Sequence, residues 1–186
     1  MRRRLRWALV LAVIGLGVDG AQAAEFSAVV ISRLNGSERQ GRVYVKGNSM
    51  RQEFPTASGV TTVIYLGDKH LAWLLMPEKK MYLEMPITAE MTKDLMQLAK
   101  DRAHMTFLTT ETVNGYQADK FETAFKTNGG VTKHFMWVAK KLGMPIKILS
   151  LDNSFSREYR DIKEGELPDT LFSPPAGYQK LSLPAN

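Results

Sequence analysis

The 186-residue chain contains no cysteine. It therefore has no disulfide, no thiol nucleophile and no cysteine to which a lipid anchor could be attached. Its three histidines, His70, His104 and His134, are too far apart in the sequence to form a two-ligand metal motif such as His-x-x-x-His. No Gly-x-Ser-x-Gly segment is present, so the sequence does not contain the nucleophile elbow of a hydrolase.

The acidic residues do not mark a catalytic site either. Glu84, Glu90, Asp94 and Asp101 lie on faces that the local periodicity predicts to be exposed, and nothing selects two of them as a glycosidase pair. The glycines stand singly between predicted strands and form no phosphate-binding loop. We therefore expect no catalytic residues, no metal and no cofactor, and we predict that the protein is not an enzyme.

The positive charge of the chain is concentrated at its start. The formal net charge is +6, and it falls to +3 without residues 1–23, which include Arg2, Arg3, Arg4 and Arg6. The remaining excess is spread along the chain, so it does not predict nucleic-acid binding. Only transient contact with an anionic membrane surface is compatible with so small a charge.

Long hydrophobic runs are also missing. Residues 8–18 are apolar, but the segment is too short to span a bilayer. The basic residues before it and Ala21-Gln22-Ala23 after it are typical of a secretory signal peptide. We predict cleavage after Ala23, which would leave residues 24–186 as one domain in the periplasm.

Short alternating segments separated by turn residues follow this leader, which is typical of an antiparallel sheet or barrel. The predicted strands are 25–33, 42–46, 49–54, 60–66, 105–113, 116–125, 131–140, 146–151 and 155–163, besides a hairpin within 72–86. The polar segment 155–163 is expected to form an edge strand that its charges protect from pairing with other chains. In the Pro-rich tail, Leu171, Phe172 and Tyr178 are expected to lie across the sheet.

The hairpin, which contains "WLLMPEKKMYLEMP", is rich in methionine. A turn around Glu78 and Lys79 would place Met76 opposite Met81. The two-residue period of strands then gives one face of Ala72, Leu74, Met76, Met81, Leu83 and Met85 and another of Trp73, Leu75, Tyr82 and Glu84. Methionine specifies a rigid core poorly because its thioether is flexible, so we infer that something adaptable lies against the first face.

One segment has helical rather than strand periodicity. Residues 88–103 begin with Thr88 as a helix N-cap, with acidic residues early and basic residues late. Ile87, Met91, Leu95 and Leu98 recur at helical spacing and would lay an apolar stripe on the sheet. The predicted hydrophobic groove between sheet and helix comprises Leu74, Met76, Met81, Leu83, Met85, Met91, Leu95 and Leu98.

The same pattern has a simpler interpretation. Methionines at strand spacing more often form an ordinary core than a ligand cavity. The clustering of Met76, Met81, Met85, Met91 and Met96 in one hairpin and the next helix favours the cavity. On the opposite face, Trp73 and Tyr82 would belong to a small second core beneath the tail.

A series of segments resembles a known family. The segments, in order, are "GRVYVKGNSMRQE", "MPEKKMYLEMP", "VNGYQADKFE", "MWVAKKLGMPIKI" and "IKEGELPDTLFSPPAGYQK". Together they resemble the LolA-like superfamily of periplasmic proteins, which includes the outer membrane lipoprotein carrier, and within it the uncharacterised lipoprotein-sorting-like branch. The resemblance implies a mainly β (α+β) fold, an unclosed antiparallel β half-barrel whose concave face is covered by helices and receives acyl chains.

The sequence departs from the carrier in its lid. Carriers begin with an amphipathic helix, whereas this chain enters a predicted strand at Glu25, so the lid would be reduced to residues 88–103. Carriers also hold the lid with a strand arginine, for which Arg51 is the candidate. We expect a non-enzymatic carrier or chaperone for lipid or lipoprotein acyl chains in the envelope. The alternative is an interaction module with a filled core that contacts an envelope protein.

Overall fold

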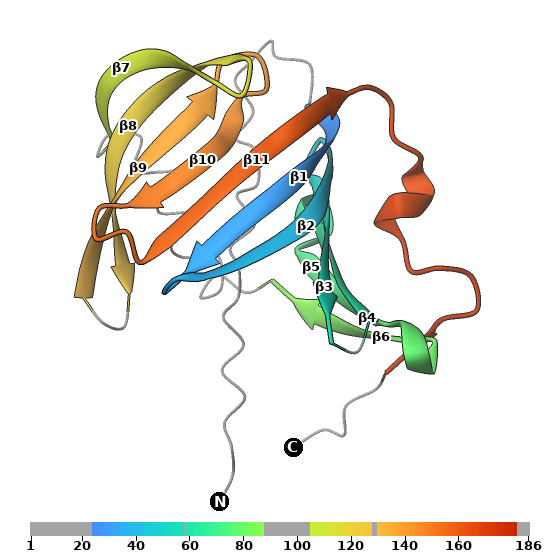
Figure 1. Ribbon diagram of the computed structural model, residues 1–186. Helices are drawn as coiled ribbons and strands as arrows, with labels where there is room; N and C mark the ends of the chain where they lie inside the picture. Colours follow the sequence, from blue (N-terminus) through green and yellow to red (C-terminus); the bar gives the residue numbers. More distant parts are fainter. Residues whose placement is uncertain (1–23, 58, 88–104, 128–129, 182–186) are drawn as a thin grey trace, which may run out of the picture.

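The computed structural model describes residues 24–57, 59–87, 105–127 and 130–181, which form one twelve-stranded sheet (Figure 1). The strands are β1 Glu25–Leu34, β2 Ser37–Lys46, β3 Ser49–Thr56, β4 Gly59–Leu66, β5 Leu71–Met76, β6 Met81–Pro86, β7 Thr106–Val113, β8 Tyr116–Thr127, β9 Gly130–Ala139, β10 Met144–Ser150, β11 Phe155–Glu164 and β12 Gln179–Lys180. Short 3-10 helices η1 (Gly67–Lys69), η2 (Pro77–Lys79) and η4 (Asp169–Phe172) lie between them.

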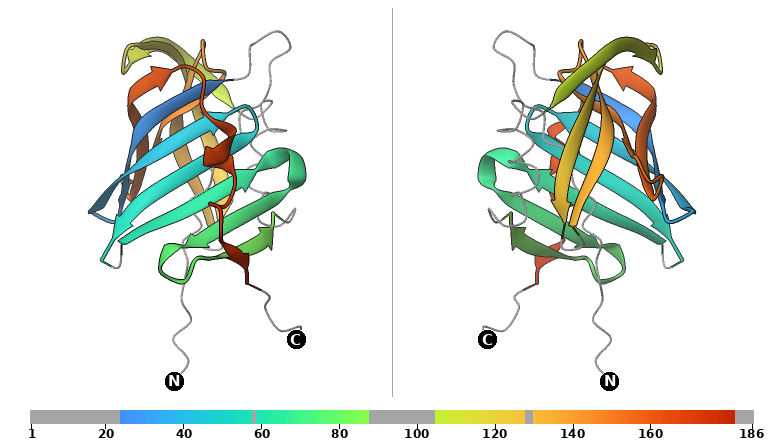
Figure 2. Two further views of the ribbon diagram at one scale, coloured as in Figure 1. Left: turned by 90° about the vertical axis from the view of Figure 1, so that its right-hand side faces the viewer. Right: turned by 90° about the vertical axis from the view of Figure 1, so that its left-hand side faces the viewer.

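The sheet is curved but not closed (Figures 1 and 2). Its strand order is β12-β6-β5-β4-β3-β2-β1-β11-β10-β9-β8-β7, so β12 and β7 form the two edges within the described residues. All neighbouring pairs are antiparallel except β12 with β6. The predicted fold class, an unclosed antiparallel β half-barrel, is confirmed, whereas the predicted helix 88–103 lies outside the described residues.

The local turn chemistry sets most of the register. Asn35 and Gly36 both have positive φ (48° and 80°), which lets a two-residue turn join β1 directly to β2. Consequently β2 begins at Ser37, five residues before the predicted strand 42–46. At the other end, β10 begins at Met144 and takes Pro145 into the strand beside a bulge.

The expectation that residues 155–163 form an edge strand is wrong. β11 lies between β1 and β10, and β1 pairs with it from Phe26↔Glu164 to Leu34↔Phe155. The charged side chains of β11 are compatible with a position in the middle of the sheet, because Glu158 and Arg160 lie on the outside of the curved sheet by the alternation of the strand. The pairing joins the first and last long strands of the sheet, and such a long-range contact leaves no local signal in the sequence.

The C-terminal tail covers the outside of β2 to β6 (Figure 2, left). Beneath it Ile64, Leu66, Leu75 and Phe172 are buried. The partly buried side chains packed against them are Tyr44, Trp73, Tyr82, Leu167, Leu171 and Tyr178. The predicted position of the tail and the small second core around Trp73 and Tyr82 are both confirmed.

Polar contacts fix the course of this tail. The N–H of Leu167 donates to Glu25 Oε1 at 2.5 Å, and Lys46 Nζ donates to the Leu167 carbonyl at 2.8 Å. Arg51 Nη1 donates to the carbonyl of Leu171 at 3.1 Å. These bonds satisfy backbone groups of a segment that has few partners of its own, so they hold η4 in register with the strands.

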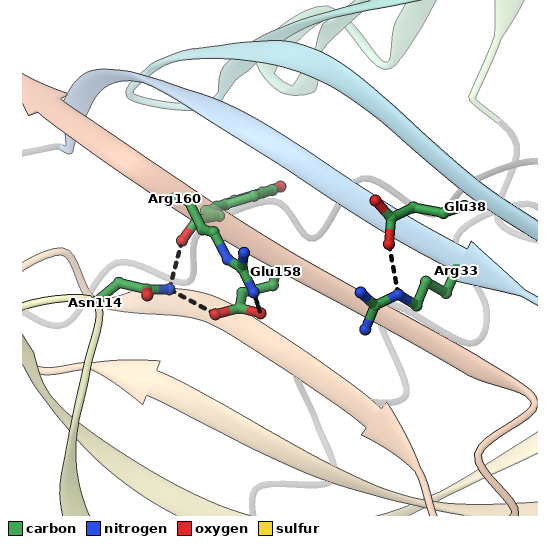
Figure 3. Close-up of polar contacts among 6 residues, drawn as sticks. Arg33, Glu38, Asn114, Glu158 and Arg160 are labelled. Atoms are coloured by element: carbon green, nitrogen blue, oxygen red, sulfur yellow. Dashed lines mark hydrogen bonds and ion pairs between the residues drawn. The ribbon is translucent and has the colours of Figure 1, made fainter.

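The β7–β8 hairpin is fastened to the middle of the sheet at its turn (Figure 3). Asn114 Nδ2 donates at 2.9 Å both to Glu158 Oε1 and to the Tyr159 carbonyl on β11. Arg160 Nη2 donates at 3.0 Å to the other oxygen of Glu158. These contacts hold the end of the edge hairpin against β11.

Removing the aromatic anchor of the tail tests this packing. We expect Phe172→Ala to lower the free energy of unfolding by about 3 kcal/mol, because a buried aromatic ring and its contacts are lost. Phe107→Ala is the matched control, since Phe107 is 56% exposed, and it should cost well under about 1 kcal/mol. Urea denaturation measures both values. Equal losses in the two variants would show that the tail does not stabilise the sheet.

A second prediction concerns the ion pair that fastens the end of the tail. Lys180 Nζ donates to Glu84 Oε1 at 2.5 Å and Trp73 Nε1 donates to Oε2 at 2.9 Å, and both lower the pKa of Glu84. The stabilisation is therefore present above the ordinary carboxyl pKa of 4.5 and is lost as the pH falls through the lowered value. In the Lys180→Met variant the pKa of Glu84 should rise but stay below 4.5, because the indole N–H of Trp73 still donates to the Glu84 carboxylate. A ¹³C NMR titration of the Glu84 carboxyl measures this pKa. The same midpoint in the wild-type protein and in Lys180→Met would contradict the ion pair.

Candidate functional site

The two faces of the sheet have different surroundings. Directly opposed residues of antiparallel strands share a face, so one row runs across six strands. That row is Phe26, Val45, Met50, Tyr65, Ala72 and Met85. We call its side of the sheet the inner face, because it lies inside the curve, and the side covered by the tail the outer face (Figures 1 and 2).

The methionine hairpin has the predicted register. Met76 lies opposite Met81, Leu74 opposite Leu83 and Ala72 opposite Met85, with η2 as the turn. The predicted groove residues of the hairpin, Leu74, Met76, Met81, Leu83 and Met85, therefore share the inner face. All five are partly exposed, and none belongs to a hydrophobic cluster formed by the described residues. Their role as a groove stays a prediction, and Met91, Leu95 and Leu98 lie outside the described residues.

Burial on the inner face is greatest in its middle. Phe26, Val30 and Val43 of β1 and β2 have no exposed surface, and they belong to the largest buried cluster. On the hairpin β5–β6 at one flank, the inner-face side chains other than Ala72 are only partly buried. The inner face is thus a packed centre with a looser apolar flank.

The other flank of the inner face contains a cavity of about 400 Å³. Met105, Phe121 and Val138 form its apolar wall, and the remaining lining residues are Asp119, Ala139, Lys140 and Gly143. A volume of this size is within the usual range for a small ligand. Sequence reasoning missed this cavity because its wall joins two strands and the segment before β7, although alternation alone would have placed Phe121 and Asp119 on one face.

The inner face also carries polar side chains, among them Arg157, Tyr65 and His134. Arg157 is 5% exposed, and its guanidinium carbon is 5.7 Å from the centre of the Tyr159 ring. Burial raises the pKa of Tyr65, and the positive charge of Arg157 acts against this rise. Burial also lowers the pKa of His134, so its imidazole is neutral at pH 7. Sequence reasoning did not single out Arg157 or Tyr65.

Arg51, the predicted lid latch, lies on the outer face. It is paired with Tyr44 and Ile64 in the row that the tail covers. Its Nε is 2.7 Å from Glu53 Oε1, and its Nη1 binds the carbonyl of Leu171. In the described part of the chain Arg51 therefore holds the tail, and the helix that it was expected to hold lies outside that part.

The described residues contain no set of three or more His, Cys, Asp or Glu side chains placed to hold a metal ion. His70 and His134 are at different places in the fold, one in an exposed turn and one in β9. Within the same residues no helix has the length and apolar character needed to cross a membrane. The inner face offers apolar contact together with the polar side chains named above, and the charged pair Asp119 and Lys140 belongs to the lining of the cavity.

One solved structure of similar length supports the fold, and two others are similar over part of their length. An uncharacterised conserved protein from Thermus thermophilus superposes with a TM-score of 0.56 at 13% identity, covering 86% of this chain and 90% of that one. MucB gives a TM-score of 0.49 at 13% identity, and the match covers 82% of this chain and 58% of MucB. MucB in complex with MucA(peri) gives the same score and identity over 86% and 56%.

The sequence comparison gives the family. No curated protein matches the chain. The family model described as "Domain of unknown function (DUF4412)" matches residues 29–144, which is more than half of the sequence and runs from β1 to the start of β10. The chain therefore belongs to the DUF4412 domain family.

Proposed function

We propose that this protein is a non-enzymatic binding or carrier protein for a hydrophobic ligand in the cell envelope, and that the ligand is a lipid or the acyl chains of a lipoprotein. One observation carries the proposal. The β5–β6 hairpin buries its outer face under the tail, while Leu74, Met76, Met81, Leu83 and Met85 on its inner face stay partly exposed. An apolar patch that stays exposed to solvent usually marks a site for a ligand, a membrane or another protein.

The side chains suit an occupant of variable shape. Methionine adapts to irregular surfaces, and each acyl CH₂ that leaves water contributes about 0.8 kcal/mol. The cavity of about 400 Å³ beside Phe121 and Val138 adds apolar volume on the opposite flank. An acyl chain that contacts either flank would gain affinity without any specific polar group.

The proposed location follows from the leader. Residues 1–23 have the order of a secretory signal peptide, so we infer that residues 24–186 act as one domain in the periplasm. The segments that resemble the LolA-like superfamily span most of that domain and support the same compartment. Contact with a membrane would then be transient, during uptake or release of the ligand, and no cofactor is required.

A second candidate is an interaction module that binds an envelope protein and carries no lipid. The middle of the inner face favours it, because Phe26, Val30 and Val43 are fully buried as in a filled core. The edge strand β7 also exposes the side chains of Phe107 (56%) and Leu108 (43%). Its backbone would pair with an extended segment of a partner, and these two side chains would contact that segment.

A charge placed on the inner face separates the two candidates. We expect Met85→Glu to weaken the binding of a fluorescent fatty acid at least about tenfold, because the carboxylate would be desolvated against the acyl chain. Leu151→Glu makes the same chemical change at a 40% exposed turn and should leave binding unchanged. Fluorescence titration with competition by unlabelled fatty acid measures the affinities, and circular dichroism checks that both variants are folded.

The outcomes are distinct. Wild-type protein that binds no fatty acid would favour the interaction module. Binding that Met85→Glu and Leu151→Glu affect equally would contradict the inner face as the site.

A further inference from the structure

The apolar cavity of the inner face lies beside a charged rim. The β7–β8 turn and the β9–β10 turn are neighbours at one end of the sheet, at the top of Figure 1, and the N–H of Lys140 donates to the Gln117 carbonyl at 2.9 Å. Lys140 lines the apolar cavity and also a second cavity of about 450 Å³, which we call the polar cavity because most of its lining residues are polar. The other residues of the second cavity are Gly115, Tyr116, Gln117, Lys141 and Glu164.

The first charged group of the rim is a carboxylate at the mouth of the apolar cavity. Thr110 Oγ1 donates to Asp119 Oδ1 at 2.5 Å, and Lys140 Nζ lies 3.1 Å from the same oxygen. The Thr110 hydroxyl, followed by Lys140, lowers the pKa of Asp119, so the carboxylate is ionised at neutral pH. The Lys140 side chain is 54% exposed.

The second group lies in the polar cavity. Lys141 Nζ donates to Glu164 Oε1 at 2.7 Å, and the Tyr116 hydroxyl donates to the same oxygen at 2.9 Å. Lys141, followed by Tyr116, lowers the pKa of Glu164, so this carboxylate is ionised as well. The Lys141 side chain is 70% exposed and that of Glu164 is 36% exposed.

Both carboxylates use only one of their oxygens in these contacts. Thr110 and Lys140 meet Asp119 through Oδ1, and Tyr116 and Lys141 meet Glu164 through Oε1. Each lysine ammonium has three N–H groups, of which one is used in its ion pair. The rim can therefore accept hydrogen bonds from a cation and donate them to an anion while both internal pairs persist.

We propose that this rim binds the headgroup of a zwitterionic amphiphile that carries one phosphate and one primary ammonium, with its acyl chain in the apolar cavity. Lys140 and Lys141 would donate to the phosphate, and Asp119 and Glu164 would accept from the ammonium. This inference rests on the proposed function and names the ligand class for the same inner face.

The balance of charge favours such a headgroup over simpler ones. The two lysines and two carboxylates sum to zero, so a headgroup with phosphate alone gains from Lys140 and Lys141 but is repelled by Asp119 and Glu164. A neutral headgroup has no favourable charge interaction with the two lysines or with the two carboxylates.

Three ligands with the same acyl chain test the assignment in the full mature chain. They are lysophosphatidylethanolamine, lysophosphatidylglycerol and monoacylglycerol, each titrated calorimetrically below its micellar concentration, with phosphoethanolamine alone as a fourth probe. We expect lysophosphatidylethanolamine to bind about tenfold more tightly than the other two lipids. Phosphoethanolamine should not bind measurably, because it lacks the acyl chain.

Two variants and a matched control locate the headgroup. Glu164→Gln keeps the shape of the side chain. It should remove most of the preference for lysophosphatidylethanolamine over lysophosphatidylglycerol. Lys140→Ala should weaken the binding of lysophosphatidylethanolamine and lysophosphatidylglycerol more than the binding of monoacylglycerol, because only the first two lipids carry a phosphate. Lys133→Ala removes an exposed, ion-paired lysine within β9, whose Nζ is 2.7 Å from Glu122 Oε1, and should leave the binding of all three lipids unchanged.

The outcomes separate this inference from the proposed function. If none of the lipids binds, the proposed function fails and the headgroup site fails with it. If all three bind equally, or if the preference survives Glu164→Gln, acyl binding stands and the headgroup site is wrong. Tight binding of phosphoethanolamine alone would identify a site for a soluble phosphate compound and would also overturn the inference.

Discussion

The packing of the C-terminal tail on the outer face is the contact on which the rest of the structure depends. A single curved sheet has two faces, and an apolar face must be covered to be stable in water. Here Phe172 and its neighbours cover the outer face of β4 and β5. Because Glu25, Lys46 and Arg51 hold the tail there, it is not available to the other side of the sheet. The inner face is left to other segments of the chain or to a ligand.

The sequence predicted much of this arrangement because most of it is local. Alternation and turn residues were enough to place Met76 opposite Met81 and to separate Trp73 and Tyr82 from the methionines. The position of β11 was not predictable in this way, since its neighbours β1 and β10 depend on pairing across the length of the chain. The cavity beside Val138 and the rim at Lys140 were missed for the same reason, because the cavity joins β8, β9 and the segment before β7, and the rim forms where two turns meet in space.

The two flanks of the inner face offer different kinds of recognition. The β5–β6 hairpin presents flexible thioethers and leucines, which tolerate many shapes and distinguish few. The flank at β8 and β9 combines an apolar cavity with ionised side chains of both signs. Apolar contact supplies affinity, and charged groups supply selectivity, because an unmatched polar group is costly to bury. A protein that holds an amphiphile needs both.

The central claim is that the inner face holds an amphiphile in the cell envelope. Native mass spectrometry of the protein isolated from the periplasm, followed by lipid extraction, tests this claim most directly. We expect the mass of the chain from residue 24 plus one bound lipid, which organic solvent releases. Recovery of the bare chain alone, under conditions that preserve a lipid complex of a known carrier, would contradict it.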